Sequence, residues 1–372
     1  MKPLVLSFIL LGLSLTGLVL PHLFRAEYTS TQNFTQKKSE SQKVFHLSTP
    51  EPLKALYMTA CVAATPAWRE SLKRLIENTE LNAVVVDIKD YSGNISFRQG
   101  ANCYISDLKD FIDRLHASEI YVIGRVAVFQ DPIYTKIYPE LAVKSKLGGI
   151  WKDHKGLSFI DVGAKPYWDY ILEISHEAYA LGFDELNFDY VRYPSDGNME
   201  DTEYSWTVGT STKPEMLESF FSYLHQNLKD TGIKMSVDIF GMTTTVTSDM
   251  GIGQVLEKTL PYFDYVSPMV YPSHYPSGWN GFSNPAEHPY EVIKIAMGSG
   301  REREITFNNG TSTPSKLRPW LQDFDLGATY GSDKIQAQIE ATYDAGLSSW
   351  MLWAASNNYT EEALLPTLQT EH

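Results

Sequence analysis

Acidic side chains stand near the ends of four strand-like segments of this 372-residue sequence. They are Asp87, Asp189, Asp238 and Asp323. Cleavage of a glycosidic bond needs two carboxyl groups, one that protonates the leaving oxygen and one that attacks carbon or activates water. An ionised aspartate inside a protein is costly unless it is paired or used. These acids therefore predict either carboxylate chemistry on a sugar or a set of buried ion pairs.

Three cations are spaced so that they could meet these acids. Lys89, Arg125 and Arg192 lie in strand-like segments, and an arginine there could hold a carboxylate or a sugar hydroxyl. An ion pair is the alternative for any one acid, for example Asp189 with Arg125 or Arg192. Ion pairs alone do not require several acids to gather at one end of a fold. We therefore expect Asp189 to act as the nucleophile, or as the stabiliser of a cationic sugar.

The alternation of apolar and polar residues predicts which of these side chains face inward, because successive side chains on a strand point to opposite faces. Val237 and Ile239 should face the helices, which turns Asp238 inward. The same rule turns both Asp87 and Lys89 inward on their own segment. Asp238 is the expected proton donor, which requires a raised pKa, and Asp87 is the reserve.

Asp323 does not fit the alternation of inward and outward side chains as simply as the other acids do. Asp189 shares a face with Asn187, but Asp323 falls on the opposite face from Gln322. Asp323 would have to turn inward at the end of its segment to join the other acids.

Aromatic and polar residues follow the strand-like segments and could bind a sugar. Loops rich in Pro, Ser and Gly, such as residues 271–280, do not form a regular element, so their aromatic side chains are free to form a ligand surface. The expected substrate-binding residues are Lys89, Arg125, Arg192, Tyr193, Tyr271, His274, Trp279, Gln322 and Trp353.

Eight strand-like segments alternate with helical ones, which indicates a parallel sheet with helical crossovers. We expect them to close into a single-domain α/β fold, a (β/α)8 TIM barrel, over residues 52–372. An open doubly wound sheet is the alternative, but no G-x-G-x-x-G follows the first strand. The expected strands are residues 53–63, 82–90, 120–129, 185–194, 233–241, 264–272, 317–324 and 347–355. In a closed barrel the catalytic groups stand at the carboxyl ends of the strands.

Composition and missing motifs exclude several other functions. The net charge of −14 would repel nucleic acid, so a neutral or cationic partner is expected. The sequence has no G-x-S-x-G, H-E-x-x-H or P-loop motif, which argues against a serine hydrolase, a zinc protease and a nucleotide hydrolase. We expect no metal and no cofactor.

The first part of the chain predicts export. Residues 4–20 carry no charge and are mostly apolar, so residues 1–25 should form a signal peptide or a membrane anchor. Residues 26–51 are rich in polar residues and are expected to be a flexible linker. We expect a protein that is secreted or anchored at the cell envelope. Cys61 and Cys103 either form one disulfide or remain as thiols.

Six blocks of sequence carry a resemblance to a known family. The blocks are V-V-D-I-K-D (85–90), G-F-D-E-L-N-F-D-Y-V-R-Y-P (182–194), S-V-D-I-F-G (236–241), Y-V-S-P-M-V-Y-P-S-H-Y (265–275), R-P-W-L-Q-D-F (318–324) and W-M-L-W-A-A-S-N (350–357). From about residue 54 to residue 358 the chain resembles a bacterial family of TIM barrels, first classified as a domain of unknown function and assigned as glycoside hydrolases. More distantly, the order of Asp189, Asp238 and Asp323 is similar to the α-amylase type of barrel, although that type has Glu as the proton donor.

Two hypotheses follow. In the first, the protein hydrolyses an envelope or extracellular polysaccharide with paired carboxylates. In the second, it is a non-catalytic barrel that binds glycans at the cell envelope.

Overall fold

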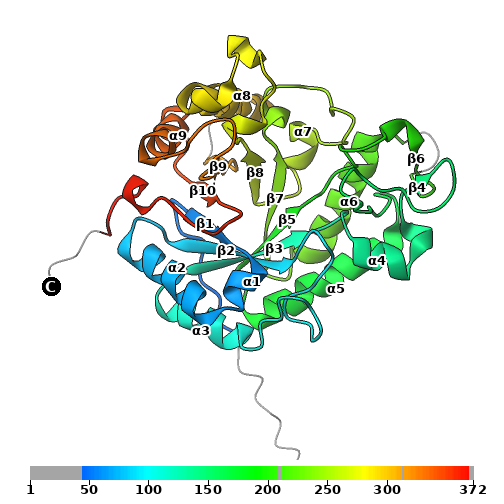
Figure 1. Ribbon diagram of the computed structural model, residues 1–372, viewed down its shortest axis with the longest axis horizontal. Coiled ribbons are helices and arrows are strands. Elements are labelled where there is room, and N and C mark those ends of the chain that lie inside the picture. Colours follow the sequence, from blue (N-terminus) through cyan, green and yellow to red (C-terminus); the bar gives the residue numbers. More distant parts are fainter. Residues whose placement is uncertain (1–43, 208–210, 312–313, 368–372) are drawn as a thin grey trace, which may run out of the picture. The chain divides into compact units, whose positions relative to one another are not determined.

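Eight parallel strands close into a barrel in the computed structural model, which describes residues 44–207, 211–311 and 314–367. Going around the barrel, the order is β1-β10-β9-β8-β7-β5-β3-β2 (Figure 1). The strands are β1 (Lys54–Met58), β2 (Ala83–Lys89), β3 (Tyr121–Ala127), β5 (Glu185–Asp189), β7 (Lys234–Phe240), β8 (Tyr265–Met269), β9 (Trp320–Gln322) and β10 (Trp350–Trp353). Each lies within one of the eight predicted segments, so the closed barrel is confirmed and the open sheet is excluded.

Helices surround the barrel, as crossover connections between parallel strands require (Figure 1). They are α1 (Ala60–Ala63), α2 (Pro66–Asn78), α3 (Leu108–Ala117), α4 (Pro132–Ile137), α5 (Lys165–Leu181), α6 (Lys213–Leu228), α7 (Leu256–Thr259), α8 (Pro289–Phe307) and α9 (Ser332–Asp344). Helix α8 continues through Gly298 and Gly300. A Cβ on Gly300 would lie 3.3 Å from side-chain atoms of Thr244 and Leu317, so this glycine allows the helix to pack closely.

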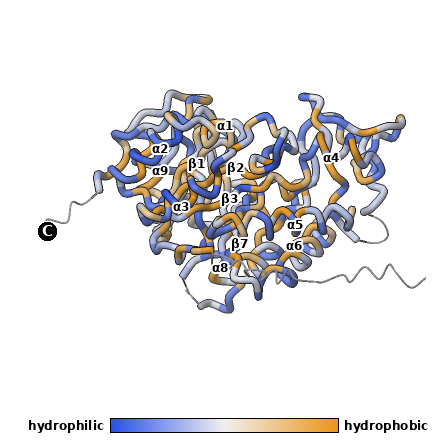
Figure 2. The backbone as a smooth tube through the Cα atoms, turned by 90° about the horizontal axis from the view of Figure 1, so that it is seen from below, coloured by the Kyte–Doolittle hydropathy of each residue, from blue (hydrophilic) through white to orange (hydrophobic). Residues whose placement is uncertain are grey.

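Alternation along the strands builds two apolar layers. Val84 and Val86 join the large core between strands and helices, while Val85 joins a smaller core inside the barrel. Figure 2 shows this concentration of apolar residues along the central strands. The inward-facing positions near the strand ends are the ones that could carry the predicted acids.

The end of the barrel where the strands begin is closed by a buried ion pair. Arg318 binds Glu185, and both side chains are at most 1% exposed. The Tyr121 hydroxyl also lies within hydrogen-bonding distance of Thr49, at 3.0 Å. Arg318 and Glu185 therefore close the barrel interior at this end, and the predicted acids stand toward the opposite end.

The end of the predicted linker belongs to the barrel. Leu47 packs against the inner core, and its backbone N–H donates to Asp184 at 2.6 Å. Residues 44–51 therefore lie against the barrel end and are ordered, which moves the domain boundary to residue 44. The predicted export segment lies outside the described residues. Among the helices of the described residues, none combines the length and the apolar character that a membrane span needs.

A small lobe extends from the barrel beside α4. Two short antiparallel strands, β4 (Lys144–Ser145) and β6 (Thr202–Glu203), pair within it, and Gln130 forms a bridge with Phe159. The sequence did not predict these strands because each has only two residues. The lobe stands beside the strand ends of β3 and β5 and extends the surface around them.

A disulfide joins Cys61 and Cys103. It connects α1 to the loop before α3, so both segments that follow β1 and β2 are linked near the strand ends. This decides between the two alternatives left open by the sequence.

Candidate active site

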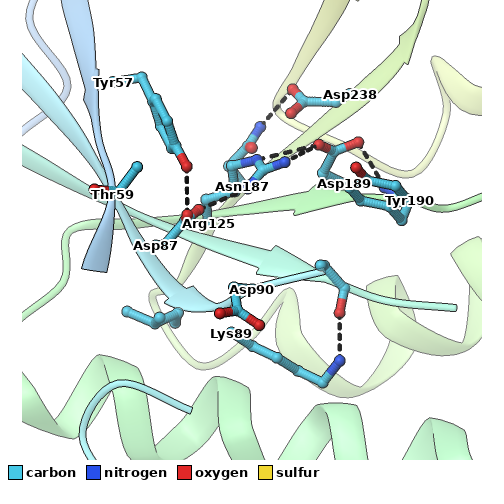
Figure 3. A network of polar contacts seen from close by, with 12 residues as sticks. Tyr57, Thr59, Asp87, Lys89, Asp90, Arg125, Asn187, Asp189, Tyr190 and Asp238 are labelled. Carbon is cyan, nitrogen blue, oxygen red and sulfur yellow. Dashed lines mark hydrogen bonds and ion pairs between the residues drawn. The ribbon is translucent and has the colours of Figure 1, made fainter. Parts of the chain in front are cut away.

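One arginine connects two of the predicted acids. Arg125 on β3 donates from Nη1 to Asp87 on β2 at 2.6 Å and from Nε to Asp189 on β5 at 3.1 Å (Figure 3). All three residues are at most 5% exposed. Burial would lower the pKa of Arg125, but Asp87 and Asp189 outweigh it and hold that pKa well above its usual value. The arginine therefore stays charged and holds both carboxyl groups in place.

The third acid is held by neutral donors. Asp238 on β7 accepts from Asn187 Nδ2 at 2.9 Å and from Trp320 Nε1 at 2.8 Å, both at Oδ1. Burial, reinforced by the charge of Asp189, raises the pKa of Asp238 to about 8. Within the described residues no hydrogen bond uses its other oxygen, Oδ2. A raised pKa favours the protonated form of Asp238 at neutral pH.

The chain turns sharply after Asp189. Tyr190 has a φ of 52°, a left-handed conformation that is strained for a bulky residue and is often found at functional sites. In this conformation its N–H donates to Asp189 Oδ1 at 2.6 Å. Both oxygens of Asp189 are thus fixed, one by the turn and one by Arg125.

An open cavity of about 320 Å³ reaches Asp189 and Arg125, whereas Asp238 and Asp87 do not line it. Asp189 and Arg125 form part of its wall, and Trp353 and Tyr271 line it together with His274. Its other lining residues are Tyr190, Arg192, Phe240, Gly241, Met242, Met269 and Tyr275. Cavities of this size, mostly apolar with a few convergent polar groups, are typical of small-molecule and sugar sites.

Aromatic rings form one side of the cavity. Trp353 stacks on Tyr57 with ring centroids 4.0 Å apart, and the Arg125 guanidinium lies 4.9 Å from the Trp353 centroid. The Tyr275 hydroxyl is buried and has no hydrogen-bond partner among the described residues. A sugar in this cavity would meet a flat apolar surface and an unused polar group.

Lys89 does not face the site, contrary to the sequence prediction. The register of β2 shifts between Asp87 and Lys89, and this bulge turns Lys89 toward the helices (Figure 3). Its Nζ binds Asp131 at 2.9 Å and donates to the Ala127 carbonyl at 2.7 Å. The strict alternation that predicted an inward side chain fails at the bulge because one extra residue reverses the faces.

Asp323 and Gln322 also lie away from the cavity. Asp323 accepts from the backbone N–H of Thr360 at 3.0 Å and from its hydroxyl at 2.9 Å. Gln322 accepts from the Ser273 hydroxyl at 2.8 Å. Both side chains hold loops in position, so the third acid of the α-amylase-like order is not part of this site.

Two predicted aromatic contacts are structural. Tyr193 is fully buried and packs against Tyr204. Trp279 packs on Tyr275, with ring centroids 4.5 Å apart, and supports the cavity wall from behind. Neither residue lines the cavity.

Tyr57 is the main contributor that the sequence prediction missed. Its hydroxyl donates to Asp87, and its ring supports Trp353. The alternation in β1 could have revealed it, because Tyr57 shares the inward face with Ala55.

Within the part of the chain that the structure describes, no cluster of His, Cys, Asp and Glu is able to hold a metal ion.

A closed parallel barrel whose strand ends carry paired carboxyl groups and stacked aromatic rings is the arrangement of a barrel glycosidase. The chain belongs to the DUF4015 family, described as a putative glycosyl hydrolase domain, whose model matches residues 55–359. This match confirms the family expected from the sequence blocks and assigns the chain to a glycosidase family.

Solved structures share the barrel at low sequence identity. The glycoside hydrolase domain of PgaB (BpsB) from Bordetella bronchiseptica has 14% identity and a TM-score of 0.59, with 84% of this chain and 98% of that chain covered. The β-galactosidase from Marinomonas ef1 has 11% identity and a TM-score of 0.56, covering 84% and 56%. The catalytic domain of β-amylase from Paenibacillus polymyxa has 11% identity and a TM-score of 0.52, covering 84% and 95%. None of the curated proteins compared with this chain matches it.

Proposed function

We propose that the protein is exported and hydrolyses an envelope or extracellular polysaccharide, with Asp189 and Asp238 as its reacting carboxyl groups. The observation that carries this proposal is the different surroundings of two neighbouring acids, an ion pair with Arg125 at Asp189 and neutral hydrogen-bond donors at Asp238. Asp189 is ion-paired with Arg125, whereas the pKa of Asp238 is raised to about 8. Two carboxyl groups whose environments separate their protonation states are what glycosidic cleavage needs.

The roles follow from these states. Asp238 holds the proton for the glycosidic oxygen, and its free Oδ2 is the atom that would deliver it. Asp189 is negatively charged and would either attack the sugar carbon or stabilise the positive charge that develops there. Trp353 and Tyr271 provide the apolar surface on which the sugar ring stacks.

Asp87 acts as a positioning residue in this scheme. It shares Arg125 with Asp189 and accepts from Tyr57, and it does not line the cavity. Its carboxylate fixes the guanidinium, which in turn fixes Asp189.

Export is supported by two features. The apolar stretch at residues 4–20 is typical of an export signal. The disulfide between Cys61 and Cys103 is the form expected in an oxidising compartment.

The acidic chain, with a net charge of −14, favours neutral or amino sugars over anionic ones as the substrate.

A non-catalytic glycan-binding barrel is the second candidate. It is favoured by the low exposure of Asp238, which is 1%, because a proton donor must reach its substrate.

A hydrolysis screen on purified polysaccharides separates the two candidates. The wild-type protein is compared with Asp189→Asn on the same panel, and glycan binding is measured in parallel. Asp323→Asn is the matched control, because Asp323 contacts Thr360 and not the cavity. Loss of hydrolysis by several orders of magnitude in Asp189→Asn alone, with binding retained, supports the proposal. Binding by the wild type without hydrolysis of any glycan supports the non-catalytic barrel.

A further inference from the structure

A second cavity adjoins the first on the side of the small lobe. Its volume is about 330 Å³, and Tyr91, Gln130 and Phe159 line it. Tyr190 and Arg192 line both this cavity and the one that contains Asp189. The two hollows are thus separated by a single shared wall that begins at the residue after Asp189.

The shared wall contains an arginine whose donors are mostly unused. Arg192 Nη1 donates to the Tyr193 carbonyl at 3.1 Å, and within the described residues it forms no ion pair. Its guanidinium lies 5.0 Å from the Phe240 ring centroid and 5.7 Å from that of Phe159. An arginine held between aromatic rings, with free N–H groups at the boundary of two cavities, is placed to bind the polar groups of a ligand that crosses it.

The wall of the second cavity also includes the aromatic ring of Tyr91. Tyr91 is 51% exposed, yet its backbone is fixed. Gln130 Nε2 donates to the Tyr91 carbonyl at 3.2 Å, and Asp90 accepts from the N–H of Ser92 at 2.8 Å. Because this ring also lines the second cavity, a ligand in that cavity could stack on it.

We propose that the two cavities form one groove that binds a polysaccharide chain on both sides of Asp189, so that the enzyme cuts internal bonds. This inference rests on the proposed function of Asp189 and Asp238 and adds the mode of cleavage. Arg192 binds the chain where it passes the reaction centre, and Tyr91 stacks on a sugar farther along. A site for chain ends only would need one closed cavity and would have no use for the second.

The test uses oligosaccharides of N-acetylglucosamine, fully acetylated and partly deacetylated, from the disaccharide to the octasaccharide. These probes are neutral or cationic, as the acidic chain requires. Binding to the whole protein is measured by calorimetry, and products are followed by mass spectrometry. We compare the wild type with Tyr91→Ala and with Arg192→Ala. The control is Tyr104→Ala, because Tyr104 is 38% exposed and lines neither cavity.

The groove predicts that affinity rises with chain length in the wild type. Tyr91→Ala should lose roughly tenfold in affinity for long chains, as expected for a stacked anchor, and nothing for the disaccharide. Arg192→Ala should weaken binding at every length, and Tyr104→Ala should match the wild type. Length-independent or absent binding, equal loss at all lengths in Tyr91→Ala, or release of terminal units only would overturn the groove.

The two proposals fail in different ways. Hydrolysis without length dependence removes the groove and leaves the carboxyl chemistry intact. Affinity that rises with chain length in the wild type and not in Tyr91→Ala, with no hydrolysis in the wild type, keeps the groove as a binding site and removes internal cleavage together with the catalytic roles of Asp189 and Asp238.

Discussion

Replacing Asp238 with asparagine tests the central electrostatic argument, because asparagine resembles the protonated acid in shape. Its Oδ1 can still accept from Asn187 and Trp320, which are 2.9 and 2.8 Å from the Asp238 oxygen. The variant should therefore fold. It cannot release a proton, so it separates the role of the proton from the role of the side chain's volume.

The size of the stability effect follows from the pKa. Burial and the charge of Asp189 raise the pKa of Asp238 from 3.8 to about 8. A group with a raised folded-state pKa stabilises the protein most below its unfolded pKa, and this stability is lost as pH rises through the folded pKa. Between about pH 4 and pH 7 the wild type should lose on the order of 4 kcal/mol from this group, at about 1.4 kcal/mol per pH unit. Asparagine does not titrate, so Asp238→Asn loses nothing from this position.

The assay is urea unfolding of both proteins at a series of pH values. The free energy of unfolding should be similar near pH 4, and the variant should exceed the wild type increasingly up to about pH 8. Titrating groups that do not interact with Asp238 cancel in the difference. The variant should also lose hydrolysis by about 10²–10⁴-fold, and its residual activity should lack the alkaline decline of the wild type. A difference in stability that is flat with pH, or that falls as pH rises, would refute a protonated Asp238.

Three further predictions concern the same network. Asp189→Asn should reduce hydrolysis by several orders of magnitude with little change in glycan affinity; unchanged kcat on a confirmed substrate would contradict its role. Arg125→Lys cannot span two carboxylates, so unfolding by urea should show a loss of about 3–5 kcal/mol, and a loss below 1 kcal/mol would show that lysine replaces the bridge. Replacing Cys61 and Cys103 with serine opens a loop of 42 residues and should lower the free energy of unfolding by about 2–4 kcal/mol. Hydrolysis by the folded variant should stay unchanged, and a loss of activity in a fully folded variant would contradict a purely structural role for the disulfide.

The sequence was sufficient for the barrel because apolar periodicity survives in every strand. Val237 and Ile239 lie in the outer core as predicted, and the same alternation placed Asp238 and Asn187 inside. The strand ends were predicted too long, since apolar residues continue into buried loops: Val191 follows β5 and is fully buried. The apolar periodicity of the sequence reflects which residues are buried, and burial continues into the loops beyond the hydrogen-bonded part of each strand.

The errors at the site have local causes. The predicted inward direction of the Lys89 side chain is wrong because of the bulge in β2. No residue type in β2 indicates this bulge, since the strand has an ordinary apolar pattern. Asp323 was assigned by analogy to strand order, but its own alternation pointed away from the axis, and the structure follows the alternation. Tyr57 is predictable as an inward-facing residue but not as a site residue, because one tyrosine in an apolar strand has the pattern of core packing and only its hydroxyl contact with Asp87 shows its role.

The distribution of charge, more than the position of any one acid, assigns the roles within the network. Asp87, Asp189 and Asp238 are each at most 5% exposed, and Arg125 is the cation that binds the first two. Lys89 cannot contribute, since the bulge commits it to Asp131. A third buried negative charge would lack a counterion, and burial without a counterion favours the neutral acid. Asp238 therefore keeps its proton because the cation is already shared, and the same bulge that removes Lys89 from the site helps to make Asp238 the proton donor.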